Sequence, residues 1–104
     1  MARKCTFEDK NFTLKENSAL ARLGALKLRS RKMALTLGTT IHLYNTTPEE
    51  FLDNKRWVKH ELKHVEQYQR FGTPGFLCRY LWESIRKGYY NNRFEVEARR
   101  AETE

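Results

Sequence analysis

The chain has 104 residues and a net charge of +7, with 20 lysines and arginines against 13 aspartates and glutamates. A chain of this length is expected to form a single domain, residues 1–104. The apolar content of 39% excludes an intrinsically disordered chain. No apolar run reaches the ~20 residues of a membrane-spanning helix, and two cysteines are too few for a disulfide framework. We therefore expect a cytoplasmic protein with neither a secretory leader nor a membrane span.

Most of the excess positive charge lies in the first third of the sequence. Residues 1–35 contain nine basic and three acidic side chains, and we interpret residues 1–15 as a basic N-terminal extension. A basic segment of this kind can bind nucleic acid, an anionic lipid surface or an acidic partner. The alternative is an ordinary solvated face, because no known nucleic-acid-binding motif accompanies the charge.

After this extension, the pattern predicts a short helix and then two strands. Asn17 and Ser18 are suitable N-caps for the helix. Its apolar stripe consists of Ala19, Leu20, Leu23 and Leu26. Residues 33–37 and 40–44 are rich in leucine and β-branched side chains and flank a turn at Gly38. These two segments predict an antiparallel hairpin.

The rest of the chain has the punctuation of helices. The sequence Thr-Pro-Glu-Glu at residues 47–50 forms a capping box, and Asn54 can cap the next helix, at residues 55–71. A further helix is predicted at residues 74–87, and a last one begins near Asn92. The apolar stripe expected for the helix at residues 74–87 consists of Phe76, Leu77, Tyr80, Leu81 and Ile85. A helix, two strands and three or four more helices define an α+β fold with a small antiparallel sheet.

The helix at residues 55–71 carries the motif H-E-x-x-H at His60, Glu61 and His64. Four residues advance a helix by about 400°, so the two imidazoles lie one above the other and can reach one metal ion. Glu61 borders the same face, where a carboxylate can act as a general base. A zinc ion at this motif needs a third protein ligand and an open fourth position. The alternative is a set of ordinary solvated polar side chains on an exposed helix.

Several segments together resemble the gluzincins, a group of zinc metallopeptidases. They are H-E-L-K-H-V-E-Q-Y from His60, G-Y-Y-N-N-R-F from Gly88 and E-V-E-A from Glu95. The length and layout are most similar to the minigluzincins, which are single-domain members. The resemblance extends over roughly residues 17–101 and implies a zincin-like domain, in which a C-terminal glutamate helix follows the H-E-x-x-H helix.

The resemblance also implies roles for individual residues. His60 and His64 are the expected zinc ligands, Glu61 is the expected general base, and Glu95 is the expected third ligand. Glu97 is a rival for that position, because Glu95 could instead complete a capping box that begins at Asn92. Where related zincins have an aspartate that orients a ligand histidine, this chain has Arg99.

The function that this resemblance implies is zinc-dependent peptide-bond hydrolysis, in which Glu61 assists the attack of a zinc-bound water on a peptide or protein substrate. The enzyme could be latent. Tyr89 or Tyr90 is a candidate donor to the oxyanion of the reaction. Residues 40–44 are either an exposed edge strand that pairs with substrate or a core strand. The alternative function is a non-catalytic zincin-like module that docks a partner or nucleic acid through its basic N-terminal face.

Overall fold

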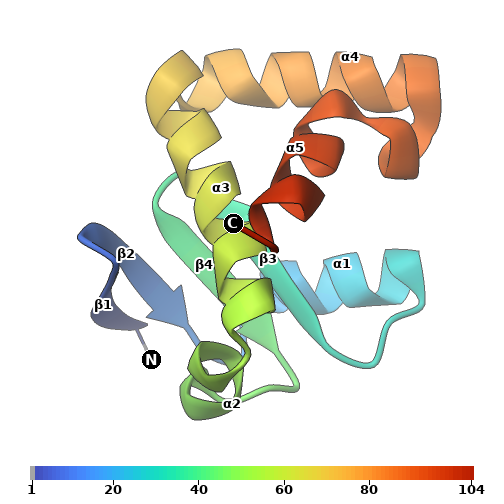
Figure 1. Cartoon of the computed structure of the whole chain (residues 1–104). Helices are drawn as coiled ribbons and strands as arrows, with labels where there is room; N and C mark the ends of the chain where they lie inside the picture. Colours follow the sequence, from blue (N-terminus) through green and yellow to red (C-terminus); the bar gives the residue numbers. More distant parts are fainter. Residues whose placement is uncertain (1) are drawn as a thin grey trace.

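The structure, a computed structural model, describes residues 2–104 and has the expected α+β architecture (Figure 1). Its strands are β1 (Ala2–Phe7), β2 (Lys10–Lys15), β3 (Met33–Leu37) and β4 (Thr40–Tyr44). Its helices are α1 (Ala19–Leu28), α2 (Pro48–Asp53), α3 (Lys55–Phe71), α4 (Thr73–Asn91) and α5 (Arg93–Ala101). Within residues 2–104, no helix has both the length and the apolar character needed to cross a bilayer.

The four strands form one mixed sheet in the order β1-β2-β4-β3. The predicted hairpin is confirmed, since β3 and β4 are antiparallel and Leu37 pairs with Thr40 across the turn at Gly38. Gly38 has a φ of +66°, a conformation that glycine adopts without strain. The sheet is mixed because β2 pairs with β4 in parallel.

The basic N-terminal segment is part of this sheet, which corrects the expectation of an extension at residues 1–15. Residue 1 lies outside the described residues, and the rest of the segment forms β1 and β2, an antiparallel hairpin. Phe12 and Leu14, two residues apart on β2, are buried in the core. This alternation is the signature of a strand with one face on the core, and the high charge of the segment obscured it.

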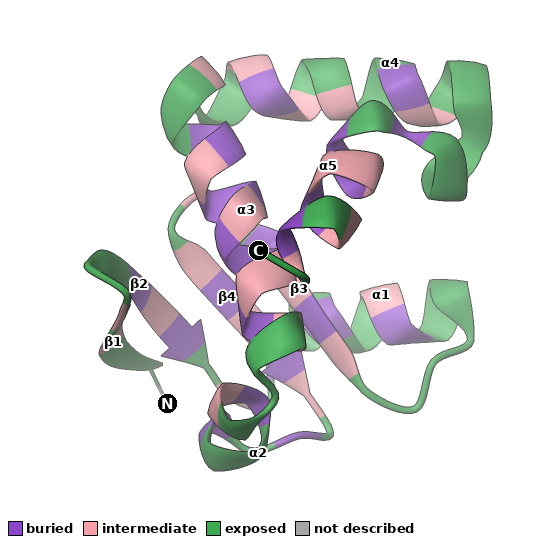
Figure 2. Ribbon diagram, viewed as in Figure 1, coloured by how far each residue is buried: buried purple, intermediate pink, exposed green. Residues whose placement is uncertain are grey.

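Helices cover both faces of the sheet. One face packs on α3 through a buried core that includes Ile41 and Leu43 of β4 and Val58 and Leu62 of α3. Side chains alternate along a strand, so Met33 points to the other face, where it lies against Gly24 of α1. The burial pattern follows this layering, with the buried residues concentrated where α3, α5 and the sheet meet (Figure 2).

The predicted caps of the middle helices are confirmed. Thr47 and Glu50 form the capping box of α2, and the Asn54 side chain accepts a hydrogen bond from the Trp57 backbone N–H at the start of α3. Helix α3 then runs without interruption to Phe71, as predicted. Helix α4 extends past its predicted end, with a kink at Gly88, where φ is +81°.

Two predicted apolar stripes differ from the structure. On α1 the buried residues are Ala21 and Ala25, whereas Leu20, Leu23 and Leu26 are exposed. Small side chains allow α1 to lie close to the sheet, so its leucines point outward. On α4, Phe76 of the expected stripe is buried, whereas Leu81 and Ile85 of the same stripe are exposed.

Candidate metal centre

Helix α3 holds the H-E-x-x-H residues at the boundary between the core and a cleft. The rings of His60 and His64 lie 5.2 Å apart, as one helical turn requires. His64 is almost completely buried and His60 is partly exposed. The helix is anchored by the apolar side chains on its opposite face, so both imidazoles project from a rigid support.

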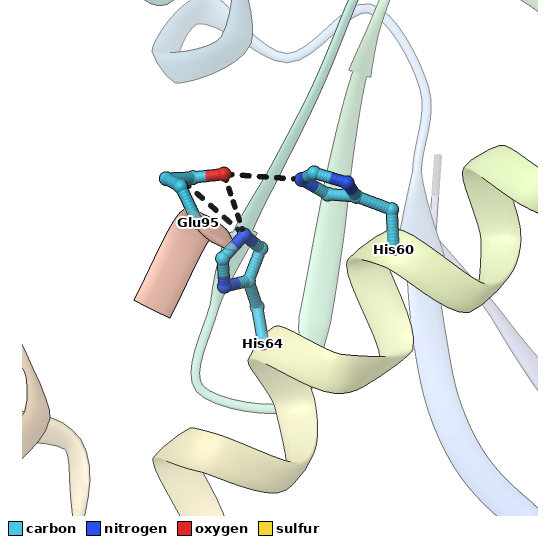
Figure 3. Close-up of side chains that lie close together, drawn as sticks. All are labelled: His60, His64 and Glu95. Carbon is cyan, nitrogen blue, oxygen red and sulfur yellow. Dashed lines mark hydrogen bonds and ion pairs between the residues drawn. The ribbon is translucent and has the colours of Figure 1, made fainter. Parts of the chain in front are cut away.

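A carboxylate from α5 meets the two histidines (Figure 3). An oxygen of Glu95 lies 3.1 Å from Nε2 of His60 and 3.3 Å from Nε2 of His64. One ligand atom from each of these three residues falls within 4.8 Å of the other two. The three side chains together are therefore placed to hold one metal ion.

The structure separates the two glutamates that the sequence left as alternatives. Glu97 faces away from the histidine pair and accepts a hydrogen bond from Gln67 Nε2 at 2.8 Å. The rival capping role of Glu95 is not observed, because the Asn92 side chain caps α5 alone, through the Phe94 N–H. The burial of Phe94 and Ala98 on α5 fixes which side of that helix faces α3.

The other ring nitrogen of each histidine has its own partner. Nδ1 of His60 donates to Glu102 at 2.7 Å, and Nδ1 of His64 donates to the side-chain oxygen of Gln67 at 2.8 Å. Related zincins orient a ligand histidine with an aspartate at the position where this chain has Arg99. In this chain, Glu102 makes the contact with His60 instead. Such hydrogen bonds orient the rings and turn each Nε2 toward the metal position.

Gln67 and Glu102 were not predicted as site residues, although each lies at a helical spacing from a predicted ligand. Gln67 follows His64 by three residues on α3, and it is fully buried, which is unusual for a glutamine. Glu102 follows Glu95 by seven residues, which is two helical turns on the same side.

The electrostatics of the cluster favour the charged forms of His60, His64 and Glu95. Burial lowers the pKa of His64, but its hydrogen bond to Glu95 and the charges of Glu61 and Glu95 outweigh this effect and raise the pKa to about 9. Burial likewise opposes charge on His60 and Glu95. Their hydrogen bonds to each other and to neighbouring groups nevertheless raise the pKa of His60 and lower that of Glu95.

Glu61 is buried beside the cluster but does not join it. Its Oε1 accepts a hydrogen bond from Thr36 Oγ1 of β3 at 2.7 Å, which fixes the carboxylate against the edge of the sheet. Burial raises the pKa of Glu61 above its usual value, and this effect exceeds the opposing influence of the nearby histidines. A buried carboxylate with a raised pKa is a suitable proton acceptor.

Two tyrosines of α4 complete the surroundings of the site. The hydroxyl of Tyr80 donates to Glu95 Oε2, and Tyr89 lines the cleft together with His60 and Glu61. Partial burial and the charge of Glu95 raise the pKa of both phenols, so both remain protonated donors at neutral pH. Tyr90, the other candidate from the sequence, is exposed and stacks against Arg99.

Two cavities meet at His60 and Glu61. One, of about 240 Å³, is mainly apolar, and its wall includes Leu28 of α1, Leu35 of β3 and Leu81 of α4. The other, of about 470 Å³, is more polar and includes Lys32 and Arg56. Strand β3 lies at the edge of the sheet beside both cavities, and residues 40–44 form the inner strand β4. Of the two alternatives for residues 40–44, the core strand is confirmed.

The fold and the site together define a class of protein. A small α+β domain that carries H-E-x-x-H on one helix and a converging glutamate on another is a metallopeptidase-like domain related to the zincins. The family model described as the eCIS core domain matches residues 16–72, more than half of the chain, and the chain belongs to this family. The match includes His60, Glu61 and His64 and ends before Glu95. No curated protein and no solved structure matches the chain.

Proposed function

We propose that this protein is a zinc-dependent metallopeptidase of the gluzincin type, most similar to the minigluzincins. The observation that carries this proposal is the convergence of Glu95 with the Nε2 atoms of His60 and His64. The H-E-x-x-H motif by itself occurs on many helices, whereas a buried carboxylate placed against both imidazoles is a specific feature of a metal centre.

The donor set fits zinc. Two imidazoles and one carboxylate are the protein ligands of many catalytic zinc sites, and they leave a coordination position open. The hydrogen bonds from Nδ1 to Glu102 and Gln67 leave Nε2 of each histidine for the ion. When bound, zinc supplies a Lewis acid that polarises the substrate carbonyl and makes water a better acid.

Glu61 is the proposed general base. Its carboxylate accepts a proton from the attacking water, holds it, and donates it to the amine that leaves when the peptide bond breaks. The hydrogen bond from Thr36 keeps one carboxylate oxygen fixed, so the other is free to accept the proton. Tyr89 is the better placed of the two candidate oxyanion donors, because it lines both cavities beside Glu61.

The cleft supports a polypeptide substrate. An extended chain could add to the free edge of β3, and its backbone would then pass Glu61 and His60. The apolar cavity between α1 and α4 has room for a large apolar side chain next to the bond that is cleaved.

The test combines metal analysis with peptide digestion by the Glu61→Gln variant. We expect the purified protein to contain about one zinc ion per chain and to cleave a peptide library. The variant keeps an oxygen for the Thr36 hydrogen bond, so it should retain zinc and lose activity by roughly 10²–10⁴-fold. Glu66→Gln, which changes a partly exposed glutamate outside the site on the same helix, is the matched control and should leave activity unchanged.

The same experiment distinguishes the alternative function. Zinc binding without peptide cleavage by the parent protein would identify a non-catalytic zincin-like module. Equal activity of Glu61→Gln and the parent would show that Glu61 is not the base.

A further inference from the structure

Helix α1 exposes apolar side chains to solvent along most of its length. The exposed fractions are 39% for Leu20, 64% for Leu23, 68% for Leu26 and 48% for Leu28. An isolated exposed leucine is ordinary, but four on one ten-residue helix form an apolar surface.

Helix α4 presents a second surface of the same kind. Leu81 and Trp82 are both 60% exposed, Ile85 is 78% exposed and Tyr90 is 69% exposed. Tyr89 of α4 is exposed as well, so α1 and α4 together hold nine of the ten large exposed apolar side chains in residues 2–104. The remaining one, Leu37, lies on β3.

The two surfaces adjoin. Leu28 of α1 and Leu81 and Tyr89 of α4 line the same apolar cavity, and all three are also exposed. The apolar surfaces of α1 and α4 therefore meet where these three side chains line the cavity. We call the exposed side chains of α1, α4 and the segment 29–32 the α1–α4 face.

The positive charge of the protein is concentrated on this face. Residues 19–32 contain five cations and no acid, and α4 contains three cations and one acid, Glu83. Glu83 is buried and pairs with Lys87. The net charge of these two segments is +7, which equals the net charge of the whole chain.

We propose that the α1–α4 face docks on an anionic lipid surface. Exposed leucine, isoleucine and tryptophan side chains interspersed with lysine and arginine are the chemistry of helices that lie in the membrane interface. The apolar groups enter the acyl boundary, and the cations stay with the anionic headgroups. This proposal concerns a surface outside the metal centre and does not rest on peptidase activity.

Other partners fit this face less well. Nucleic acid would neutralise the cations but leave Trp82 and Ile85 in water. A second copy of the chain would place two surfaces of charge +7 against each other. A helical protein partner would need a groove on this face. The exposed side chains of Leu23, Leu26, Trp82 and Ile85 line neither of the two cavities that meet at His60 and Glu61.

The experiment measures binding of the full chain to lipid vesicles by co-flotation. Vesicles of phosphatidylcholine with about 30% phosphatidylserine should bind the protein, and vesicles of phosphatidylcholine alone should bind it at least about tenfold more weakly. Raising the salt concentration from 0.1 M to 0.5 M should also weaken binding, because the headgroup charge is screened.

Trp82 provides a direct optical signal. In a Trp57→Phe background, Trp82 is the remaining tryptophan, and its emission should shift to shorter wavelength when anionic vesicles are added. A shift shows that the indole enters the apolar boundary, which binding through cations alone does not produce.

Variants test which residues make the contact. The double variant Trp82→Ser/Ile85→Ser should bind anionic vesicles about tenfold or more weakly, and Arg86→Gln about fivefold more weakly. Leu37→Ser, which removes the exposed leucine outside the face, is the matched control and should bind like the parent. Circular dichroism and zinc content verify that each variant remains folded.

Three results would overturn the proposal. They are no binding to anionic vesicles, binding that the double variant retains in full, and binding without an emission shift of Trp82. Tight binding to a nucleic-acid homopolymer with no vesicle binding would assign the face to nucleic acid instead.

Discussion

At the scale of single residues, each imidazole of the metal centre is held at two points. Nε2 faces Glu95, and Nδ1 donates to Glu102 in His60 and to Gln67 in His64. Gln67 is in turn fixed by Glu97 through a hydrogen bond of 2.8 Å. Both carboxylates of α5 therefore belong to the site, Glu95 as a candidate ligand and Glu97 through its hydrogen bond with Gln67.

The Glu102→Ala variant should bind zinc about 10–100-fold more weakly than the parent, because His60 loses the hydrogen bond that orients it. A competition titration against a chromophoric chelator measures this change. Glu104→Ala, two residues further along the same terminal turn, is the control and should bind zinc like the parent. Equal zinc affinity in all three proteins would contradict the positioning role of Glu102.

Zinc affinity should fall as the pH falls. A metal ligand must be a neutral imidazole, and the raised pKa of His64, about 9, means that this ring holds an extra proton at pH 7 when a chelator has removed the metal. Zinc must displace that proton, so the apparent affinity should rise between pH 6.5 and 8.5, approaching tenfold per pH unit for one proton.

Isothermal titration calorimetry in two buffers of different ionisation enthalpy tests this prediction at pH 7. The difference in heat should correspond to the release of about one proton or more per zinc bound. Release of no proton, with an affinity that does not change over this pH range, would contradict it.

At the scale of elements, the N-terminal hairpin contributes to the core. Leu14 of β2 is fully buried, so Leu14→Ala should lower the free energy of unfolding by about 2–5 kcal/mol. Leu37→Ala removes the same groups from a partly exposed position on β3 and should cost about 1 kcal/mol or less. Urea denaturation measures both values, and an equal small cost would mean that the hairpin is not part of the cooperative fold.

The position of this hairpin also affects access to the site. The sheet order places β1 and β2 beyond β4, on the side away from β3, and the cleft lies beside β3. Residues 2–15 therefore do not cover the cleft, and β1–β2 contacts the helices through pairs such as Arg3 with Glu49 and Lys10 with Glu66.

At the scale of the whole molecule, the candidate metal centre joins side chains of α3 and α5. If zinc binds the folded state and not the unfolded state, it should raise the free energy of unfolding by about 2.7 kcal/mol at a free zinc concentration 100-fold above the dissociation constant. For a domain of this size, chelation should lower the melting temperature by roughly 10 °C.

Thermal unfolding with and without a chelator measures the shift. The His64→Ala variant lacks a ligand, so its melting temperature should not respond to the chelator. An unchanged melting temperature of the parent protein would mean that no structural link through a metal exists.

Local patterns in the sequence were sufficient to predict the middle of the fold. The capping box at Thr47, the cap at Asn54 and the spacing of His60 and His64 depend on residues within one or two helical turns. Hydrogen bonds and side-chain direction in a helix repeat with a fixed period, so these features follow from the order of residues alone.

The sequence could not decide features that depend on how distant elements pack. Glu95 and Glu97 lie on different sides of one helix, and only the packing of α5 against α3 turns Glu95 toward the histidines. The outward leucines of α1 and the parallel pairing of β2 with β4 likewise depend on close contacts between segments far apart in the chain. Local periodicity determined where the helices and the H-E-x-x-H motif lie, and tertiary packing decided which carboxylate completes the metal centre.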